Sequence, residues 1–522
     1  MTLDNVLAER SFGEVPVIGV PSLVKGRLLR PAWPTIRDLN SALASHRRGV
    51  AHRTGAGSYL IVEEASGRDK GEKAARVLVI DAPQPDALCE RDPAAAIREL
   101  MSMKPRDVYD FVDAVGKALQ RLQPRAVPDW AAGERVATAT HAQIGGMFRG
   151  DQVRLMVETE LGPLWSSALD RWTPAASPVV QGITSRMATG HGTSAGDPCP
   201  HRALIRGIPT TQLHITAGNT ALVPATSLLW AWAARGACVL KSAAGTIVPN
   251  AAIAAAIAAV DPGHPLARHT SVVYWRGGDE VIEQKMLARG AFQKRVVWGS
   301  SDTVSALAGT GGGTDTVVMR PRHAMSIVAR SPEGRDLAAM AELAATDSVV
   351  ADQRACMSSL LHVVEGDDRD AEAYAIALAD ALASWDHRMP PGPSARAVQG
   401  SIVQLRRGLL ADGTWLLDRG AEDAHWAVVR TDRSFDLTRH PGGRLVVVRA
   451  STEPLRVVES LVATDISHVG IAPEGERERL RDALVSMGVD NVLPLGQAER
   501  IFAGRPHDGM QILHRLIRWV SA

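Results

Sequence analysis

Residues 213–242 read LHITAGNTALVPATSLLWAWAARGACVLKS and contain the clearest secondary-structure pattern of the chain. It begins with a short apolar run (213–217), continues with an apolar segment long enough for a helix (223–235) and ends with a second short run (237–242). Short β-rich runs on either side of a helical segment predict a right-handed βαβ crossover between parallel strands. The expected fold class is therefore α/β.

The same alternation continues after residue 242. Further strand-like runs (271–275, 295–299 and 316–320) alternate with helical patterns (249–260, 279–289 and 301–308). A second α/β region follows, with helices expected over 334–345 and 370–385 and a strand over 444–450. The first 200 residues show a weaker pattern, with a helical segment expected over 94–122 and a loop over 182–200. The sequence thus predicts a parallel sheet followed by a second α/β unit.

Composition excludes several classes of protein. The 522 residues carry a formal net charge of +1, so no global field favours nucleic acid or an anionic membrane. No apolar run approaches the roughly 18–20 residues of a membrane span, and the N-terminus lacks the basic flank and apolar core of a secretory signal. The four cysteines form no CxxC pair, and the sixteen histidines show no metal-binding spacing. We expect a cytoplasmic protein without a disulfide framework or a structural metal.

Polar residues follow several expected strands at their carboxyl ends, where ligands bind in open α/β sheets. Asn219 follows the first strand, and Lys241 and Ser242 end the second. Gly299 and Ser300 stand between a strand and the N-terminus of a helix, which is a common anion site. Each also has a simpler interpretation: Asn219 as a turn residue capping the next helix, Lys241 as a solvated strand end, and Gly-Ser as an ordinary strand-to-helix turn.

Cys356 lies in the polar segment DQRACMS (352–358), between an expected helix and the strand-like run LLHVVEG. A nucleophilic thiolate needs nearby positive charge or backbone donors to lower its pKa from about 8.5, and Arg354 and the amides of a turn could supply them. A buried, inert cysteine is the alternative. His507, in RPHDG (505–509), is a second candidate site residue, although a histidine in a turn is the simpler interpretation.

Taken in order, the signals GNxxxxP, LKS, WGS and DQxxCxS resemble the aldehyde dehydrogenase superfamily. The resemblance is greatest to its acyl-CoA reductase branch, the LuxC-type fatty acid reductases. Residues 214–227 (HITAGNTALVPATS), 469–497 and 505–520 (RPHDGMQILHRLIRWV) are similar to the oxyanion strand, the C-terminal region and the terminal helix of that branch. The resemblance covers residues 205–522. It implies an aldehyde dehydrogenase-like fold, with a Rossmann-type cofactor domain and an α/β catalytic domain.

The resemblance also implies how the chain is divided and what it binds. Residues 1–322 would hold an N-terminal region and the NAD(P)-binding domain, and 323–470 the catalytic domain with Cys356. Residues 471–522 would return to the cofactor domain or to an oligomer contact. The implied cofactor is NADPH, with NADH as the alternative, and the implied substrate is an acyl-CoA or carrier-bound acyl thioester. A homo-oligomer and an acyl-transferring partner enzyme are further expectations.

Individual roles follow from the same resemblance. Cys356 matches the nucleophile, and Asn219 matches the amide that holds the oxyanion together with the backbone N–H of the cysteine. Further residues match positions that contact the cofactor, the first two at its ribose and the last two near its diphosphate: Lys241, Ser242, Gly299 and Ser300.

One departure from the superfamily bears on the direction of the reaction. Aldehyde-oxidising members have a glutamate about 34 residues before the cysteine, in an ELGG segment, as the general base that activates hydrolytic water. Here the corresponding segment, VMRPR (318–322), has no carboxylate. This favours reduction of a thioester to an aldehyde. The alternatives are NAD(P)-dependent aldehyde oxidation, acyl phosphate reduction and a non-catalytic scaffold paralogue.

Overall fold

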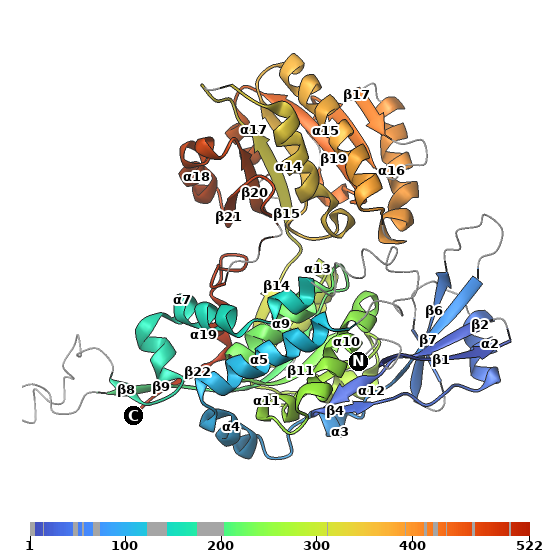
Figure 1. Ribbon diagram of the computed structural model, residues 1–522, viewed down its shortest axis with the longest axis vertical. Coiled ribbons are helices and arrows are strands. Elements are labelled where there is room, and N and C mark those ends of the chain that lie inside the picture. Colours follow the sequence, from blue (N-terminus) through green and yellow to red (C-terminus); the bar gives the residue numbers. More distant parts are fainter. Residues whose placement is uncertain are drawn as a thin grey trace, which may run out of the picture.

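The computed structural model places two α/β lobes one above the other (Figure 1). It describes residues 6–13, 15–44, 51–54, 57–65, 74–122, 143–174, 203–310, 312–332, 334–391, 393–411, 415–420, 426–434, 436–461, 465–498, 500 and 503–522. The loop expected over 182–200, which includes Cys199, lies outside the described residues.

The lower lobe is built on the sheet that residues 213–242 predict. Its parallel strands have the order β14-β13-β10-β11-β12, and β10 pairs with β11 on one side and β13 on the other. The direction of winding therefore reverses at β10, which marks the usual ligand site of an open parallel sheet. An antiparallel hairpin, β3-β4, extends the β12 edge. The strands are β3 (Ser22–Val24), β4 (Arg27–Leu29), β10 (Thr211–Ile215), β11 (Ala237–Ser242), β12 (Thr270–Tyr274), β13 (Lys294–Trp298) and β14 (Asp315–Met319).

Helices pack on this sheet through apolar faces. The helix expected over 94–122 is in fact two helices, because Pro105 cannot continue the first and instead opens the second. Helices α5 and α7 share one apolar core with α9, so segments from the first 200 residues help to build this lobe. Its helices are α3 (Pro85–Leu88), α4 (Pro93–Ser102), α5 (Pro105–Gln120), α7 (Gly150–Ala168), α9 (Leu222–Ala233), α10 (Ile247–Val260), α11 (Pro265–Arg268), α12 (Glu280–Met286) and α13 (Ser301–Ala308).

The upper lobe begins at His323. Its strands have the order β17-β18-β19-β16-β15-β20-β21, parallel except for the β17-β18 pair. The expected domain boundary after residue 470 falls inside β20, and the sheet continues to Pro494. The strands are β15 (His323–Val328), β16 (Ser359–Glu365), β17 (Trp415–Gly420), β18 (Ala427–Thr431), β19 (Leu445–Ser451), β20 (Ile466–Ala472) and β21 (Asn491–Pro494). The helices packed on them are α14 (Leu337–Val349), α15 (Asp368–Arg388), α16 (Pro393–Ala411), α17 (Pro454–Leu461) and α18 (Arg477–Ser486).

After β21 the chain returns to the lower lobe (Figure 1). The single terminal helix suggested for 505–520 is wrong: this segment holds a turn, a short helix α19 (Ile512–Leu516) and a strand β22 (Arg518–Ser521). β22 pairs antiparallel with β9 (Leu204–Ile208), which also pairs with β8 (Thr173–Pro174). Trp519 and Val520 favour extended backbone, and β9 offers them a partner that the local sequence does not reveal.

A separate sheet at the N-terminus extends to one side of the lower lobe (Figure 1). Its strand order is β1-β2-β7-β6-β5, and Leu39 and Ala42 of α2 share its apolar core. The elements are β1 (Ala8–Phe12), β2 (Val15–Gly19), α2 (Ile36–Ala44), β5 (Ala51–Arg53), β6 (Ser58–Ala65) and β7 (Ala74–Asp81).

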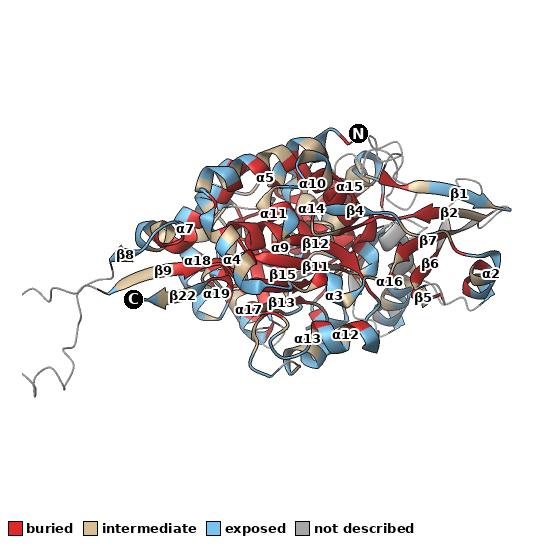
Figure 2. Cartoon of the chain, turned by 90° about the horizontal axis from the view of Figure 1, so that it is seen from below, coloured by how far each residue is buried: buried red, intermediate tan, exposed pale blue. Residues whose placement is uncertain are grey.

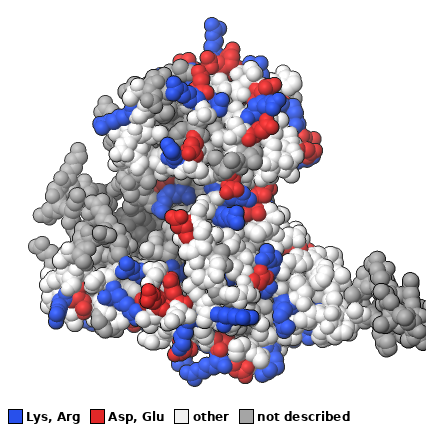
Figure 3. Space-filling model, turned by 180° about the vertical axis from the view of Figure 1, so that it is seen from behind, with Lys and Arg blue, Asp and Glu red and all other residues white. Residues whose placement is uncertain are grey.

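Burial follows the sheets. In Figure 2 the central strands are buried, whereas the outward faces of helices are exposed. Figure 3 shows cationic and anionic side chains interspersed over one face, in keeping with the net charge of +1. No helix in the described part of the chain has the length and apolar character needed to cross a membrane.

Candidate active site

A left-handed turn positions Cys356. After α14, residues 351–353 have φ values of 46, 51 and 61°. The left-handed conformation costs roughly 1–2 kcal/mol for each non-glycine residue, so the surroundings must hold this turn. Buried Arg444 donates to the Asp352 carboxylate at 3.0 Å, and the Gln353 side chain donates to the carbonyl of the first residue of β16 at 2.8 Å. The second bond spans the turn, because Cys356 lies between Gln353 and Ser359 in the sequence.

The surroundings of the Cys356 thiol favour its protonated form. Burial raises its pKa to about 11, and the charge of Asp508 acts in the same direction. The charge of Arg505 and the backbone amides of Cys356 and Met357 act in the opposite direction. The sequence suggests Arg354 as the source of positive charge, but Arg505 supplies it. A reaction at this thiol therefore needs a group that accepts its proton.

Asn219 reaches from the lower lobe to the turn that carries the cysteine. Its Nδ2 donates to the backbone carbonyl of Arg354 at 3.0 Å. This bond uses one amide hydrogen and leaves the second for another acceptor. The Oδ1 atom is buried and has no hydrogen-bond partner within the described structure. The Asn219 side chain therefore contacts the backbone of the turn two residues before Cys356.

A cleft of about 810 Å³ lies at the carboxyl ends of β10, β11 and β13, and Cys356 and Asn219 both line it. Its wall in the lower lobe includes closely packed backbone. A Cβ atom on Gly245 would lie 2.6 Å from the carbonyl oxygen of Gly218, so this loop has no room for a side chain there. Bare backbone at such a wall allows a ligand to approach closely.

Most of the residues that the sequence assigns to cofactor contacts line this cleft. Burial lowers the pKa of Lys241 to about 8, and Gly299 leads into Ser300, whose hydroxyl caps the N-terminus of α13. Ser242 does not line the cleft: it is buried, and its Oγ accepts a hydrogen bond from Asn250 of α10 at 2.6 Å. Side chains alternate along a strand, so Ser242 points away from the cleft when Lys241 faces it.

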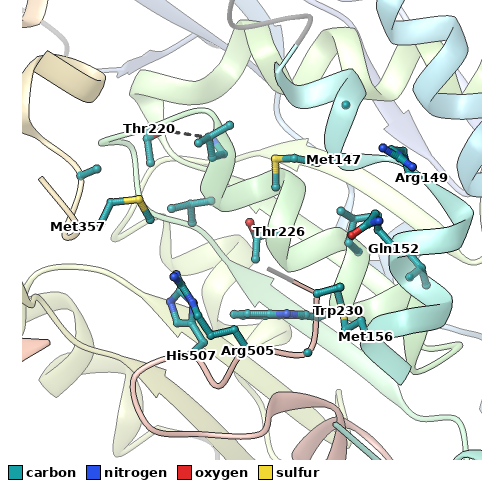
Figure 4. A pocket seen from close by; sticks show the side chains of 18 of the residues that line it. Met147, Arg149, Gln152, Met156, Thr220, Thr226, Trp230, Met357, Arg505 and His507 are labelled. Atoms are coloured by element: carbon teal, nitrogen blue, oxygen red, sulfur yellow. Dashed lines mark hydrogen bonds between the residues drawn. The ribbon is translucent and has the colours of Figure 1, made fainter. Parts of the chain in front are cut away.

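A second cavity, of about 370 Å³, meets the cleft at Cys356 and Asn219. We call it the apolar cavity. Figure 4 shows it extending from Met357 at one end to Arg149 and Gln152 at the other. Its volume lies within the range of small-molecule sites. Apolar side chains make up most of its wall, several of them from α7 and α9: Met147, Val153, Met156, Leu222, Val223, Leu229, Trp230 and Trp298.

The RPHDG segment contributes a further side of the site. The backbones of His507 and Met510 exchange two hydrogen bonds of 2.9 Å, and Asp508 and Gly509 between them have φ values of 47 and 73°. This is the pattern of a type I′ turn, for which Asp-Gly is a preferred sequence. His507 lines both cavities, Arg505 lines the apolar cavity and Asp508 lines the cleft.

His507 is both a turn residue and a residue of the site. Its ring meets the rings of Trp230 and Trp298 edge-on, with centroid distances of 5.2 and 5.0 Å. Burial lowers its pKa to about 4, so the imidazole is neutral at physiological pH.

Trp298, which lines both cavities, is held by a buried hydrogen-bond chain. Its indole N–H donates to Ser227 Oγ at 3.1 Å, and Ser227 Oγ lies 2.7 Å from His214 Nδ1. The Gln212 amide nitrogen donates to Thr210 Oγ1, so Gln212 Oε1 is the atom that faces His214, and it can only accept. The His214 Nε2–H therefore donates to Gln212 Oε1 at 2.9 Å. A neutral ring that donates through Nε2 accepts at Nδ1, and the Ser227 hydroxyl therefore donates to it. Burial lowers the pKa of His214 to about 3, and the neutral ring is fixed in one tautomer.

Sequence reasoning missed the wall formed by α7 and the positions of Arg505 and Asp508. Helix α7 shows only the pattern of a helix packed on a core, which does not distinguish a cavity wall. The RPHDG motif offers a signal, because binding and catalytic residues are often on loops that a rigid scaffold positions. No group of three or more His, Cys, Asp and Glu side chains in the described residues could hold a metal ion.

Comparison with known proteins identifies the family. A sequence model described as Acyl-CoA reductase (LuxC) matches residues 205–519, from β9 to β22. The chain belongs to this family. The family match begins after α7, so the helix that walls the apolar cavity lies outside the matched region.

Curated relatives of the family match at low identity. The long-chain acyl-protein thioester reductase of Vibrio harveyi is 24% identical over 320 residues, which cover 61% of this chain and 65% of the relative. The protein of the same name from Photorhabdus luminescens is 25% identical over 321 residues, with 61% and 65% coverage. The match spans less than two thirds of the length of either relative.

Solved structures share the fold. Aldehyde dehydrogenase 21 from Physcomitrella patens has a TM-score of 0.67 at 12% identity and covers 88% of this chain and 94% of its own. An NADP-dependent glyceraldehyde-3-phosphate dehydrogenase from Bacillus halodurans has a TM-score of 0.64 at 13% identity, with 96% and 98% coverage. The expected aldehyde dehydrogenase-like α/β fold is confirmed.

Proposed function

We propose that this chain reduces an acyl thioester, either an acyl-CoA or a carrier-bound acyl group, to the aldehyde. The reaction would use NADPH, or NADH in its place, and pass through an acyl group bound to Cys356. One observation carries the proposal: the Cys356 thiol and the Asn219 amide lie where an apolar cavity meets a polar cleft at the sheet's ligand edge. The names of the curated relatives, thioester reductases, agree with it.

The two cavities suit different parts of the reaction. The apolar cavity would hold the acyl chain, because its methionine, leucine and tryptophan side chains remove methylene groups from water. The cleft would first hold the departing thiol and then the nicotinamide. The carrier thiol must leave before hydride transfer, because its departure forms the acyl-cysteine that the hydride reduces.

The residues of the cleft fit a dinucleotide. The amine of Lys241 can donate to ribose hydroxyl groups, and the N-terminus of α13 at Ser300 suits a diphosphate. The bare backbone near Gly218 and Gly245 leaves room for close approach. Ser242 faces α10 and takes no part in this assignment. A reduced nicotinamide bound here supplies a hydride to the acyl carbon.

Residues of this chain would carry the remaining steps. The Cys356 thiolate attacks the thioester carbonyl, and the resulting oxyanion accepts hydrogen bonds from the free Nδ2 hydrogen of Asn219 and from the Cys356 backbone amide. Expulsion of the carrier thiol leaves an acyl-cysteine. After reduction, the thiohemiacetal collapses to the aldehyde and frees the Cys356 thiolate, which takes a proton from solvent.

The segment 318–322 supports the reductive direction. This segment corresponds to the one that contains a glutamate in aldehyde-oxidising members of the superfamily, and it has no carboxylate. Its last residue, Arg322, pairs with Asp465 and Asp490 at 3.2 and 2.6 Å. A guanidinium cannot act as the general base that hydrolysis of the acyl-cysteine needs. The acyl group would therefore await hydride rather than water.

A substrate panel tests the proposal. The purified protein would receive octanoyl-CoA or octanoyl phosphate with NADPH or NADH, and octanal with the oxidised cofactors. We expect octanal from octanoyl-CoA, and none from the Cys356→Ala variant. Oxidation of octanal without thioester reduction, or reduction of the acyl phosphate alone, would assign the chain a different reaction. No turnover of any substrate would favour a scaffold.

The remaining expectations belong to the same proposal. A homo-oligomer in the cytoplasm and an enzyme that delivers the acyl group are implied by the resemblance to the LuxC-type reductases. Size-exclusion chromatography with light scattering would measure the oligomeric state.

A further inference from the structure

Asp508 is a carboxylate in the cleft that contains the nucleophile, and none of the steps above uses it. It lines the cleft together with Cys356, and its charge is felt at the thiol. Its place is fixed, because it is the first central residue of the type I′ turn closed by His507 and Met510. Within the described residues, no hydrogen bond engages its carboxyl oxygens, so they remain available to a reacting group.

The charged groups around Asp508 favour a carboxylate that can change its protonation state. Burial raises the pKa of Asp508, and Asp465 acts in the same direction. Arg322 and Arg505 oppose this shift, and the charge of Asp508 in turn raises the pKa of Asp490. A carboxyl group whose pKa lies nearer to that of a thiol is a better partner for proton exchange with it.

The side of the site on which Asp508 lies is informative. It lines the cleft and not the apolar cavity, whereas Arg505 lines the apolar cavity and not the cleft. If the acyl chain occupies the apolar cavity, the bond to the carrier sulfur points into the cleft. Asp508 then lies on the side from which the carrier thiol departs.

We propose that the Asp508 carboxylate takes the proton of the Cys356 thiol as the sulfur attacks, and passes this proton to the departing carrier thiol. This inference rests on the proposed function. The S–H bond of Cys356 breaks and the new S–C bond forms, while the proton goes to Asp508. The C–S bond to the carrier then breaks, its electron pair stays on the carrier sulfur, and the proton of Asp508 neutralises that sulfur. Asp508 ends as it began, without net oxidation or reduction.

His507 is the competing candidate for this proton, because it lines both cavities. Its ring lies edge-on against Trp230 and Trp298, and its buried Nε2 has no partner within the described structure. Burial there disfavours the imidazolium that would form on taking the proton. Burial instead favours proton uptake by Asp508, because the protonated carboxyl group is neutral.

The test compares two thioesters of one acid: octanoyl-CoA, whose alkyl thiol needs a proton to leave, and S-phenyl thiooctanoate, whose aryl thiol leaves readily as the thiolate. Acylation of Cys356 would be followed by rapid quench and intact mass without cofactor. For Asp508→Asn we expect a loss of about 100-fold or more with octanoyl-CoA, in the range of general acid–base catalysis. The loss with the phenyl ester should be at least about ten-fold smaller, because this substrate needs Asp508 only to accept the Cys356 proton and not to protonate the leaving sulfur. Asp508→Glu should recover part of the rate with octanoyl-CoA.

A second readout reports the charge of Asp508 directly. The pH midpoint of Cys356 alkylation by iodoacetamide should move to lower pH in Asp508→Asn, because a neutral amide no longer raises the pKa of the thiol. Asp465→Asn is the matched control: it removes a neighbouring carboxylate that pairs with Arg322 but does not line the cleft. Because the charge of Asp465 contributes to the raised pKa of Asp508, this variant should change the ratio of the two acylation rates slightly, and by far less than Asp508→Asn does.

The remaining outcomes distinguish a failure of the role proposed for Asp508 from a failure of the proposed thioester reduction. Equal losses with both thioesters, or no loss with octanoyl-CoA, would overturn the role of Asp508. The same would follow if His507→Gln, and not Asp508→Asn, discriminated between the thioesters. If the wild type released octanoic acid and Asp508→Asn did not, Asp508 would be a general base that activates water. This result would also overturn its proposed role in proton transfer between the two thiols. Failure of the wild type to acylate with either thioester would instead refute the proposed function, and the alkylation shift would still report on the Asp508–Cys356 pair.

Discussion

Replacing Asn219 by alanine isolates one hydrogen bond to the transition state of acylation. In the structure, one Nδ2 hydrogen donates to the Arg354 carbonyl at 3.0 Å and orients the amide, and the other is free to meet the oxyanion. A preoriented oxyanion donor is typically worth about 2.7–4 kcal/mol. Asn219→Ala should therefore slow acylation of Cys356 by roughly 100- to 1000-fold. The effect on folding should be small, since Arg354 is exposed and water can replace the lost donor at its carbonyl.

The assay is single-turnover acylation by octanoyl-CoA, followed by intact mass on the millisecond-to-minute scale. Alkylation of Cys356 by iodoacetamide serves as the internal control, because displacement of iodide forms no oxyanion and needs no such donor. Asn219→Asp keeps the shape but faces the oxyanion with a carboxylate, so it should acylate more slowly than Asn219→Ala. A loss smaller than about three-fold, or an equal loss in alkylation, would refute the role of Asn219.

Further predictions concern the thiol, the cleft and a buried carboxyl. Alkylation of Cys356 at neutral pH should be on the order of ten-fold slower than that of an exposed cysteine. A pKa of about 11 leaves little thiolate, and the higher nucleophilicity of that thiolate offsets only part of the deficit. The alkylation rate should keep rising above pH 9, and a plateau below pH 8 would contradict this prediction. Lys241→Ala should raise KM for NADPH about ten-fold or more, because it removes a charged hydrogen bond to the cofactor. The rate of cofactor-free acylation should stay within about two-fold of the wild-type rate. An unchanged KM would exclude Lys241 from the cofactor site. Glu160 is buried and accepts a hydrogen bond from the Leu513 amide at 2.9 Å, and burial raises its pKa to about 7. Its contribution to the free energy of unfolding is therefore complete below pH 4.5. The contribution declines as the pH rises to about 7, by up to about 3 kcal/mol. Urea unfolding should show Glu160→Gln to be more stable than the wild type at pH 8 and similar at pH 4.5, and the opposite order at pH 8 would contradict the assignment.

The part of the site that could be predicted from the sequence follows from strand geometry. Asn219, Lys241 and Gly299 stand at the carboxyl ends of parallel strands, and such ends meet at one edge of a sheet whatever the rest of the chain does. The same geometry separates Ser242 from the cleft. Adjacent side chains of a strand point to opposite faces, so Lys241 and Ser242 could not both face the cleft.

The remainder depends on contacts between distant segments. Arg505 and Asp508 reach Cys356 because the chain returns from β21 to the lower lobe, and no local pattern reports that path. The α7 side of the apolar cavity likewise depends on contacts between segments that are distant in the sequence. The terminal strand β22 forms only because β9, more than 300 residues earlier, offers an edge. Turn chemistry was more informative, since Asp-Gly in RPHDG does form a type I′ turn.

In the proposed reaction, Cys356 holds the acyl group until hydride, and not water, reacts with it. Its most direct test is intact-mass spectrometry of the protein after octanoyl-CoA alone and after a chase with NADPH. We expect a mass gain of one octanoyl group located at Cys356, stable without cofactor and lost on addition of NADPH as octanal appears. Acylation that persists in Cys356→Ala, or release of octanoic acid in place of octanal, would contradict it.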